Sequence, residues 1–402
     1  SALASQAKEA GPTPVSCSRT SGAGGNVGLF RVKRNFSNIL DQLEQDRLHR
    51  LYAKVPQWAC VEGISVPGNL ALEQCSSSAA AIYKASLAPG GVIADLTSGL
   101  GVDVWAFAKI PDAKVYYNDI RPELCRAAAD NFRLLGLDNV EISNLGAEER
   151  LSTLGRVDMI FADPARRSES GRKLFRLEDC SPDITALMPS IWEHTDLLMV
   201  KLSPMADISL VSARLEGLAE VHVTGTSTEC KELLCILRKG WNSGYSVSAA
   251  VLDRESAQTV NLVRKDGLRV PLSGEPAEGD VLLEPVPVLS KTGMYPEICE
   301  TFGLRQLDPS VHLFSIADDG KDHKPADRFF RKFRIKEIAG FGRQAFREIG
   351  KRYPVADVSA RNLPLKSEEL KMKMGVTGSG DTHIFGVGVQ SRRLLLVTER
   401  VF

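Results

Sequence analysis

Apolar and polar residues follow two different periods along the chain, and the change between them predicts its organisation. Between residues 30 and 88 apolar side chains recur three and four positions apart among charged ones, which predicts helices. The members of this stripe are Ile39, Leu40, Leu43, Leu48 and Leu51. A second helix is expected from Ser76 to Ala85, and Pro89 and Gly90 then interrupt the helical pattern.

From residue 92 onward, short apolar runs alternate with amphipathic segments. The expected strands are Val92–Leu96, Val115–Asn118, Val140–Ser143, Val157–Ala162, Leu197–Leu202, Val221–Val223 and Leu233–Leu237. The expected helices are Val102–Lys109, Pro122–Leu135, Ile184–Glu193 and Ala206–Leu215. Such alternation predicts an α/β fold in which helices cover a doubly wound, mostly parallel sheet of seven strands.

The pattern changes again after Gly240. Strands are expected at Tyr245–Leu252 and Val260–Val263, and a small α+β unit between Leu282 and Ser315. From Lys324 the order is strand, helix, strand, helix and two final strands. We therefore divide the chain into a flexible leader (1–29), a helical region (30–88), an α/β domain (89–245), a connecting unit (246–325) and a C-terminal α+β domain (326–402).

Composition excludes several classes of protein. Lys and Arg number 50, as do Asp and Glu, so the global charge does not indicate a partner. The eight cysteines are scattered and do not pair with histidines at zinc-ligand spacing, so we expect reduced thiols and no metal. No window approaches 18 consecutive apolar residues, and the leader does not have the pattern of a signal peptide. We expect a cytoplasmic protein without a membrane span.

The first segment with chemical character is the turn after the first predicted strand. That strand ends in Asp95, and Thr97, Gly99 and Gly101 follow before the next helix. Glycines at such a turn let a ligand approach the backbone. Thr97 stands where a dinucleotide-binding fingerprint has glycine, which argues against a pyrophosphate and is compatible with a cofactor lacking phosphate.

Two further acids follow predicted strands. Asp119 stands 24 residues after Asp95, where a carboxylate can accept hydrogen bonds from ribose hydroxyls. Its alternative role is to cap the helix that begins at Pro122. Asp163 and Pro164 end a later strand at the same expected edge of the sheet.

In this order the three segments resemble motifs I, II and IV of class I S-adenosylmethionine-dependent methyltransferases, over roughly residues 70–240. The resemblance implies S-adenosylmethionine as cofactor and a Rossmann-like fold. It places the turn from Asp95 to Gly101, with Thr97 and Gly99, around the methionine part and Asp119 on the ribose. Glu148 becomes the candidate for the adenine side, because Gly146 stands where family members often have Asp.

The resemblance also implies candidates for the reaction itself. Enzymes that methylate exocyclic amines carry Asp/Asn-Pro-Pro-Tyr, whereas this chain keeps Asp163 and Pro164 but has Ala165 and Arg166. Lys201 closes the fifth strand and resembles the lysine of ribose 2′-O-methyltransferases, with Lys84 and Glu229 or Glu232 completing that set. A structural Asp163–Lys201 pair is the alternative, so amine and hydroxyl targets both stay open.

The C-terminal region is locally basic. Residues 324–373 carry fourteen Lys and Arg against six Asp and Glu, a net charge of +8. The candidate RNA-binding residues are Arg334, Arg343, Arg347, Arg352 and Arg361. This region resembles a THUMP-like domain, and the unit before it a small ferredoxin-like domain, both associated with RNA-modifying enzymes. A solvated basic face over an aromatic core is the alternative.

These observations favour a methyltransferase that acts on RNA, either tRNA or rRNA. Two alternatives remain at this stage. The enzyme could methylate a protein or a small molecule, or the chain could be a non-catalytic RNA-binding protein that retains the cofactor fold. RNA binding would weaken steeply with salt, because it depends on the attraction of phosphates.

Overall fold

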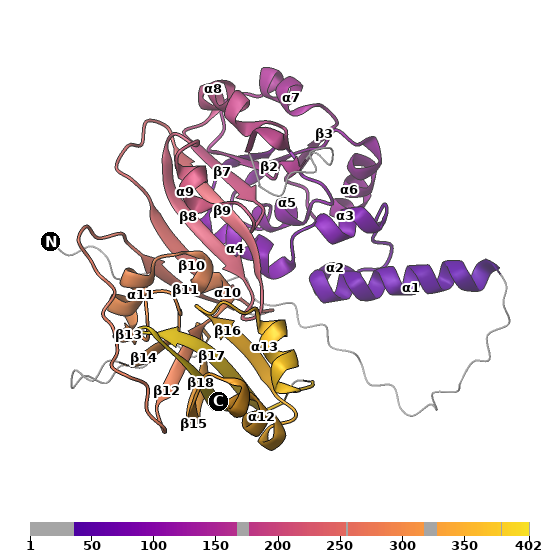
Figure 1. Ribbon diagram of the computed structural model, residues 1–402. Coiled ribbons are helices and arrows are strands. Elements are labelled where there is room, and N and C mark those ends of the chain that lie inside the picture. The colour runs from indigo at the N-terminus through magenta and orange to yellow at the C-terminus, as the bar shows by residue number, and fades with distance from the viewer. Residues whose placement is uncertain (1–35, 167–176, 255, 317–327, 379, 402) are drawn as a thin grey trace. The chain divides into compact units, whose positions relative to one another are not determined.

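A computed structural model of the protein describes residues 36–166, 177–254, 256–316, 328–378 and 380–401 (Figure 1). The predicted leader, residues 1–29, lies outside these ranges. The chain divides into two compact units. The first contains residues up to 168, 178–199 and 253–256, and the second contains residues 169–177, 200–252 and 257–402.

The first unit begins with helices and continues with strand–helix repeats. Its helices are α1 (Phe36–Lys54), α2 (Pro56–Ala59), α3 (Asn69–Gln74), α4 (Ser78–Leu87), α5 (Val102–Phe107), α6 (Pro122–Leu134), α7 (Ala147–Thr153) and α8 (Ile184–His194). Its strands are β1 (Val92–Asp95), β2 (Lys114–Asn118), β3 (Val140–Ser143), β4 (Met159–Ala162), β5 (Ala165–Arg166) and β6 (Cys180–Ser181). A 3-10 turn (Leu177–Asp179) precedes β6.

Strands β1 and β4 are short and almost fully buried, as expected for central strands of a parallel sheet, whereas β3 at the edge of the sheet is only partly buried. Strand β1 pairs in parallel with β2 and with β4, and β2 pairs in parallel with β3. All four residues of β4 are buried. Parallel pairing brings the carboxyl ends of these strands to one edge of the sheet, where Asp95 is the last residue of β1.

The second unit is richer in strands. Its strands are β8 (Leu218–Gly225), β9 (Cys230–Arg238), β10 (Ser246–Leu252), β11 (Ala257–Leu262), β12 (Val281–Pro285), β13 (Leu304–Gln306), β14 (Phe314–Ile316), β15 (Phe330–Gly340), β16 (Asp357–Arg361), β17 (Thr382–Val389) and β18 (Arg392–Val401). Its helices are α9 (Ile208–Ser212), α10 (Pro287–Lys291), α11 (Tyr295–Phe302), α12 (Arg343–Arg352) and α13 (Ser367–Met374). Strand β7 (Leu197–Leu202) crosses the division between the units.

The α/β prediction is confirmed, but the expected number of seven strands is wrong. Among the described residues the larger sheet has nine strands, in the order β11-β10-β8-β9-β7-β4-β1-β2-β3. The two additional strands are β10 and β11, which we assigned to the connecting unit. Strand β10 is mostly buried and pairs in parallel with β8, so its apolar side chains extend the sheet.

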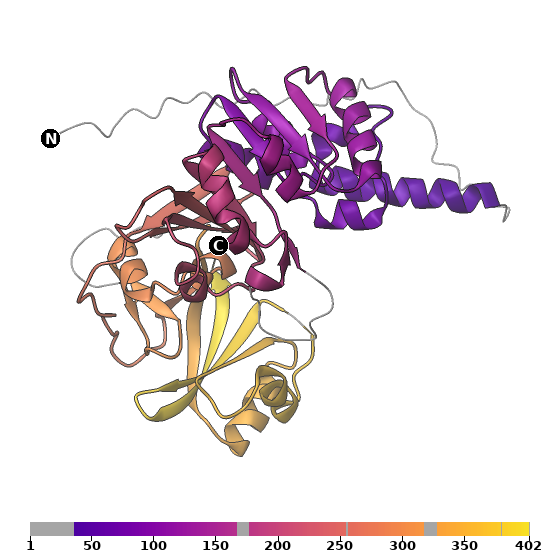
Figure 2. The same cartoon turned by 90° about the horizontal axis from the view of Figure 1, so that it is seen from above.

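A second sheet lies within the second unit and has seven strands in the described part, ordered β13-β14-β12-β15-β18-β17-β16. Figure 2 shows α12 and α13 beside its yellow strands. One face holds a cluster around Phe333 and Phe385, and the other packs on these helices through Ile384 and Leu395. The sheet thus combines strands from both sides of position 325.

The N-terminal helices belong to the core of the first unit. Trp58 of α2 is fully buried and makes edge-to-face contacts with Trp105 and Phe132, each at a ring-centroid distance of 6.4 Å. Across the described ranges, no helix has the length and apolarity that crossing a membrane requires. The seven cysteines of the described residues are all free thiols.

The position of Trp58 gives a prediction of stability. We expect Trp58→Ala to lower the free energy of unfolding by about 3–5 kcal/mol, because the cavity left by the indole cannot collapse fully. Urea unfolding followed by circular dichroism measures this change. Leu70→Ala is the matched control, since Leu70 is 60% exposed and its truncation should cost about 0.5 kcal/mol or less. Equal effects of the two substitutions would contradict the assignment of Trp58 to the core.

Candidate active site

Three acids end adjacent parallel strands of the first unit. Asp95 is the last residue of β1, Asp119 directly follows β2, and Asp163 directly follows β4. Because β1 lies between β2 and β4, the carboxyl ends of all three strands meet at one edge of the sheet. The sequence prediction that these acids share one region therefore has a structural basis.

Asp95 is a buried carboxylate with one unsatisfied oxygen. The residue is 1% exposed, its Oδ1 accepts a hydrogen bond from Thr97 N (2.9 Å), and its Oδ2 has no hydrogen-bond partner among the described residues. Burial raises the pKa of Asp95 well above 3.8, and the nearby carboxylates of Asp103 and Asp163 add to the increase. A cationic group with N–H donors, such as the ammonium group of S-adenosylmethionine, would satisfy this oxygen.

Thr97 joins the ends of two strands. Its Oγ1 accepts a hydrogen bond from Asp163 N (2.6 Å), while its own N–H binds Asp95. The threonine that replaces glycine in this turn thus holds the β1 turn against the end of β4. Contact of Thr97 with the cofactor stays a prediction.

The two glycines of the turn serve different purposes. Both have positive φ angles, 57° for Gly99 and 89° for Gly101. A Cβ on Gly99 would meet nothing closer than 4.0 Å, so this glycine faces open space. A Cβ on Gly101 would lie 2.7 Å from the ring of Phe132, so that glycine is required by packing. The open approach expected for both glycines is therefore found only at Gly99.

Asp119 is buried and already accepts several hydrogen bonds. Its Oδ2 accepts from Gly99 N (2.9 Å) and from Arg121 Nη2 (3.2 Å), and its Oδ1 accepts from Arg121 N and Nε. A carboxylate offers about four lone-pair sites, so these bonds fill them. Ribose hydroxyls could bind Asp119 only if the Arg121 side chain, which is 42% exposed, moved away. Helix α6 receives no side-chain cap from its N-cap residue, Arg121.

Several side chains near Asp119 were not predicted from the sequence. Ile120 follows it and is 72% exposed, which offers an apolar surface to a ring. Asn118 is buried and donates to the carbonyl oxygens of Leu96 and Leu145, which ties the two neighbouring loops together. An exposed apolar residue after a strand-end acid is the signal that could have identified Ile120.

Glu148, which we predicted for the adenine side, is exposed in the first turn of α7.

The residues predicted to act on the substrate fall in both units. Asp163 is half-buried and Pro164 buried, and the following Ala165 and Arg166 form a two-residue strand paired with β6. The side chain of Arg166 lies outside the described part. Lys201 is half-buried on β7 and belongs to the second unit, so its pairing with Asp163 stays a prediction.

Of the other members of the proposed lysine set, Lys84 has a defined place. It is fully buried, its Nζ lies 2.9 Å from Asp103 Oδ1, and Ser76 Oγ bridges the two at 2.7 and 2.8 Å. This network links α4 to the first turn of α5 behind the Asp95 turn. Glu232 is buried and accepts a hydrogen bond from Thr224, whereas Glu229 is exposed and pairs with Lys231.

Comparison with known proteins identifies the activity. No protein-family model matches the chain. It is 26% identical over 312 residues to an uncharacterized S-adenosylmethionine-dependent methyltransferase of Mycobacterium tuberculosis, found in two strains. The aligned residues are 77% of this chain and 80% of the relative. A crystal structure from Porphyromonas gingivalis, of a protein named only provisionally as a methyltransferase, superimposes with a TM-score of 0.77 and 26% identity over 89% of both chains. The protein is an S-adenosylmethionine-dependent methyltransferase.

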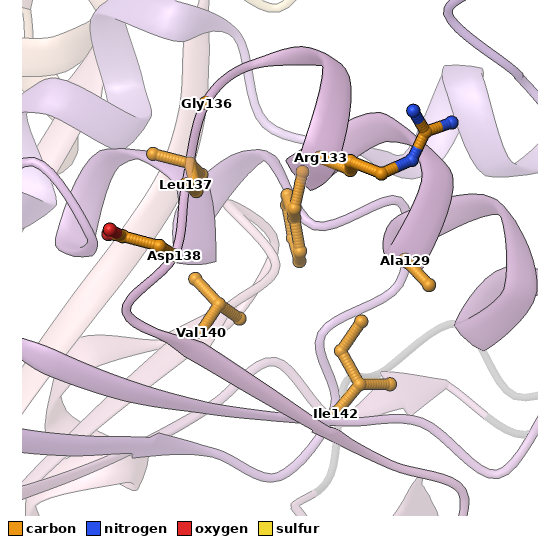
Figure 3. A pocket seen from close by; sticks show the side chains of 8 residues that line it. Ala129, Arg133, Gly136, Leu137, Asp138, Val140 and Ile142 are labelled. Carbon is orange, nitrogen blue, oxygen red and sulfur yellow. The ribbon is translucent and has the colours of Figure 1, made fainter.

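A solvent-open cavity of the methyltransferase lies elsewhere in the first unit. It has a volume of about 390 Å³, and Figure 3 shows its lining between α6 and β3. The lining residues are Ala129, Phe132, Arg133, Gly136, Leu137, Asp138, Val140 and Ile142. The cavity is lined by the loop before β3 and by Val140 and Ile142 of that strand, and none of Asp95, Asp119 and Asp163 lines it. We assign it no role in the reaction.

The five candidate RNA-binding arginines do not form one group. Arg343, Arg347 and Arg352 belong to α12 and are exposed, and Arg352 Nη2 is bound to Glu337 at 2.5 Å. Arg334 is exposed on β15, where it donates to Gly279 O. Arg361 is half-buried and paired with Glu284. Whether they contact RNA stays a prediction.

The raised pKa of Asp95 predicts that cofactor binding depends on pH. Below its pKa the carboxyl is neutral and attracts a cation weakly, so the affinity for S-adenosylmethionine should rise with pH above 3.8, by at most about tenfold per unit, until Asp95 is ionised. Calorimetric titrations between pH 5 and 7 measure this dependence. Asp95→Asn should bind more weakly and with less pH dependence. The same profile in both proteins would show that Asp95 is not the titrating group.

The engagement of Asp119 predicts that Arg121 competes with the cofactor. Arg121→Met should free two acceptor positions on Asp119 and remove a positive charge, so S-adenosylmethionine should bind several-fold more tightly. The demethylated product S-adenosylhomocysteine has no sulfonium charge and should gain less. Arg126→Met, on an exposed residue of α6, is the control. Weaker binding in Arg121→Met would mean that Arg121 holds the cofactor.

Proposed function

We propose that this methyltransferase modifies RNA, with tRNA and rRNA as the candidate classes. The observation that carries the proposal is the charge of helix α12. Its solvent-facing side presents Arg343, Arg347 and Lys351, while Phe346 and Ile349 are buried beneath it. Within the described part of the chain, Arg343 and Arg347 take part in no ion pair, so their charges remain available to phosphates.

We further propose that the second unit contains the RNA-recognition module. In this assignment residues 246–325 contain the connecting strands β10 and β11, which join the larger sheet, followed by the ferredoxin-like domain, and residues 326–402 form the THUMP-like domain. The order of β15, α12, β16, α13, β17 and β18 supports this interpretation, because it repeats the expected order of strand, helix, strand, helix and two strands. Because strands of both proposed domains belong to one seven-stranded sheet, the two domains would bind RNA as a single structural unit.

The chain's own residues would bind the cofactor and orient the acceptor. Asp95 and the Gly99 turn fit the methionine part, and Asp119 and Ile120 fit the adenosine. The sulfonium of the cofactor supplies an activated methyl group, so the protein contributes mainly alignment and charge complementarity. Asp163 would accept a hydrogen bond, or the proton, from the attacking atom. A base amine and a ribose hydroxyl both satisfy this role, and Lys201 would assist in the hydroxyl case.

The test of the proposal is methyl transfer to RNA. The full-length protein, methyl-labelled S-adenosylmethionine and total RNA from cells lacking this protein are incubated, and the labelled nucleoside is identified by mass spectrometry. We expect Asp163→Ala to lower the rate of transfer by about 10²–10⁴-fold, because it removes the acceptor at the reacting atom. Binding of the cofactor should change little.

Two controls sharpen this test. Asp163→Asn keeps the shape but loses the charge, so an intermediate rate would indicate hydrogen bonding, and a rate as low as that of the alanine variant would indicate proton transfer. Incubation with cell protein and with a small-molecule extract tests the other acceptor classes. Labelling of either of these, with none in RNA, would overturn the proposal.

A further inference from the structure

One face of the seven-stranded sheet, the one that holds Phe333 and Phe385, is apolar except at one end, where charged side chains lie. Side chains alternate between the two faces of a strand, so Glu284 shares a face with Leu282, and Arg331 shares a face with Phe333. Leu282 and Phe333 belong to the buried cluster that also contains Phe385. Residue Arg400 is the register partner of Phe333 on β18 and continues this face.

One buried carboxylate organises two arginines at this end. Glu284 is 5% exposed, its Oε1 lies 2.6 Å from Arg361 Nη2, and its Oε2 lies 3.2 Å from Arg331 Nε. Both arginine side chains are 41% exposed, although Nε of Arg331 is buried and its ion pair with Glu284 does not have hydrogen-bond geometry. Two positive charges face one negative charge. Glu284 therefore orients the arginines without neutralising them.

A histidine beside the arginines adds no charge. His383 Nε2 lies 2.9 Å from Ser359 Oγ, and its ring stacks on Phe385 at 4.0 Å. Burial lowers the pKa of His383 to about 4, and the nearby charges of Arg331, Arg361 and Arg400 lower it as well. The imidazole is therefore neutral at pH 7. Asp357 is the register partner of His383 on β16.

A pair of stacked rings lies in the same unit as Glu284 and Arg361. Tyr295 and His312 are parallel within 11°, with ring centroids 4.1 Å apart, and both are half-buried. Tyr295 also contacts Phe314, with ring centroids 6.2 Å apart, and Phe314 is the register partner of Leu283, the neighbour of Glu284 in β12. Burial is the main cause of the raised pKa of Tyr295 and of the lowered pKa of His312, and the positive charge of Arg361 lowers both. Flat rings next to fixed cations are the elements with which proteins bind single-stranded nucleic acid.

We propose that Arg331, Arg361 and Arg400, here called the arginine cluster, bind the phosphodiester backbone of an RNA strand. Arginine is suited to phosphate because its planar group donates several hydrogen bonds at once. The Tyr295–His312 pair would support an adjacent base. The inference rests on the proposed function, and it assigns the strand to the sheet face opposite the one covered by α12. The proposal therefore places Arg361 on a different face of the sheet from the exposed arginines of α12.

The experiment measures the affinity of the full-length protein for a fluorescent 12-nucleotide single-stranded RNA by anisotropy at several salt concentrations. Arg400→Gln tests the cluster without touching Glu284. The double variant Arg361→Gln/Glu284→Gln removes one charge of each sign, so no charge is left buried alone. We expect each to weaken binding roughly five- to tenfold and to reduce the slope of log affinity against log salt by about 0.7 for each phosphate that the variant no longer binds.

A third variant separates stacking from charge. Tyr295→Leu should weaken binding roughly tenfold with an unchanged salt slope, because a base–ring contact releases no counterion. Arg393→Gln, on an exposed residue of the opposite face of β18, is the matched control and should bind as the wild type. Circular dichroism and cofactor titration verify that each variant is folded.

The outcomes distinguish this inference from the proposed function. If the cluster variants methylate RNA and bind the 12-mer with wild-type affinity and salt slope, the arginine cluster is not the site. The same conclusion follows if only Arg343→Gln and Arg347→Gln weaken binding, or if a polyglutamate peptide competes as well as RNA does. Failure of the proposed function would instead appear as absence of RNA methylation by the wild-type enzyme.

Discussion

The proposed cofactor site depends on a carboxylate that the fold removes from water, that of Asp95. Asp95 is the last residue of the central strand β1 and is 1% exposed. A buried charge is costly unless it is compensated, and within the chain Asp95 receives one N–H from Thr97. The neighbouring acids Asp103 and Asp163 increase the cost. This site is therefore electrostatically incomplete without a cation, and the ammonium group of the cofactor that we propose binds here would supply one.

Much of this arrangement was accessible from the sequence. The strand–helix alternation placed Asp95, Asp119 and Asp163 at one edge, because parallel strands have only one carboxyl edge. The sequence could not indicate that the Arg121 side chain donates two hydrogen bonds to the carboxylate of Asp119, since that contact depends on side-chain geometry. Nor could it separate the roles of the glycines. Gly101 is required by the ring of Phe132, a residue distant in sequence whose position follows from packing.

The second unit was predicted less completely. Counting charges found its basic character but treated Arg361 as equivalent to Arg343, although they lie on different sides of a sheet. Deciding the face of a residue needs the strand register, and Glu284 and Arg361 meet although three strands separate β12 from β16 in the sheet. The strands β10 and β11 were recognised, but their addition to the larger sheet was not. Which strands pair with each other is determined by tertiary packing and cannot be predicted from an apolar run alone.

The order of strands in the smaller sheet has a consequence for how the protein is made. Strand β18 lies between β15 and β17, so it inserts between segments that precede it in synthesis. Until it arrives, the edges of those two strands expose unpaired N–H and C=O groups that other chains could pair with. Pairing of distant segments is also slow. A newly made chain should therefore pass through a stage that is prone to aggregation and favours chaperone binding.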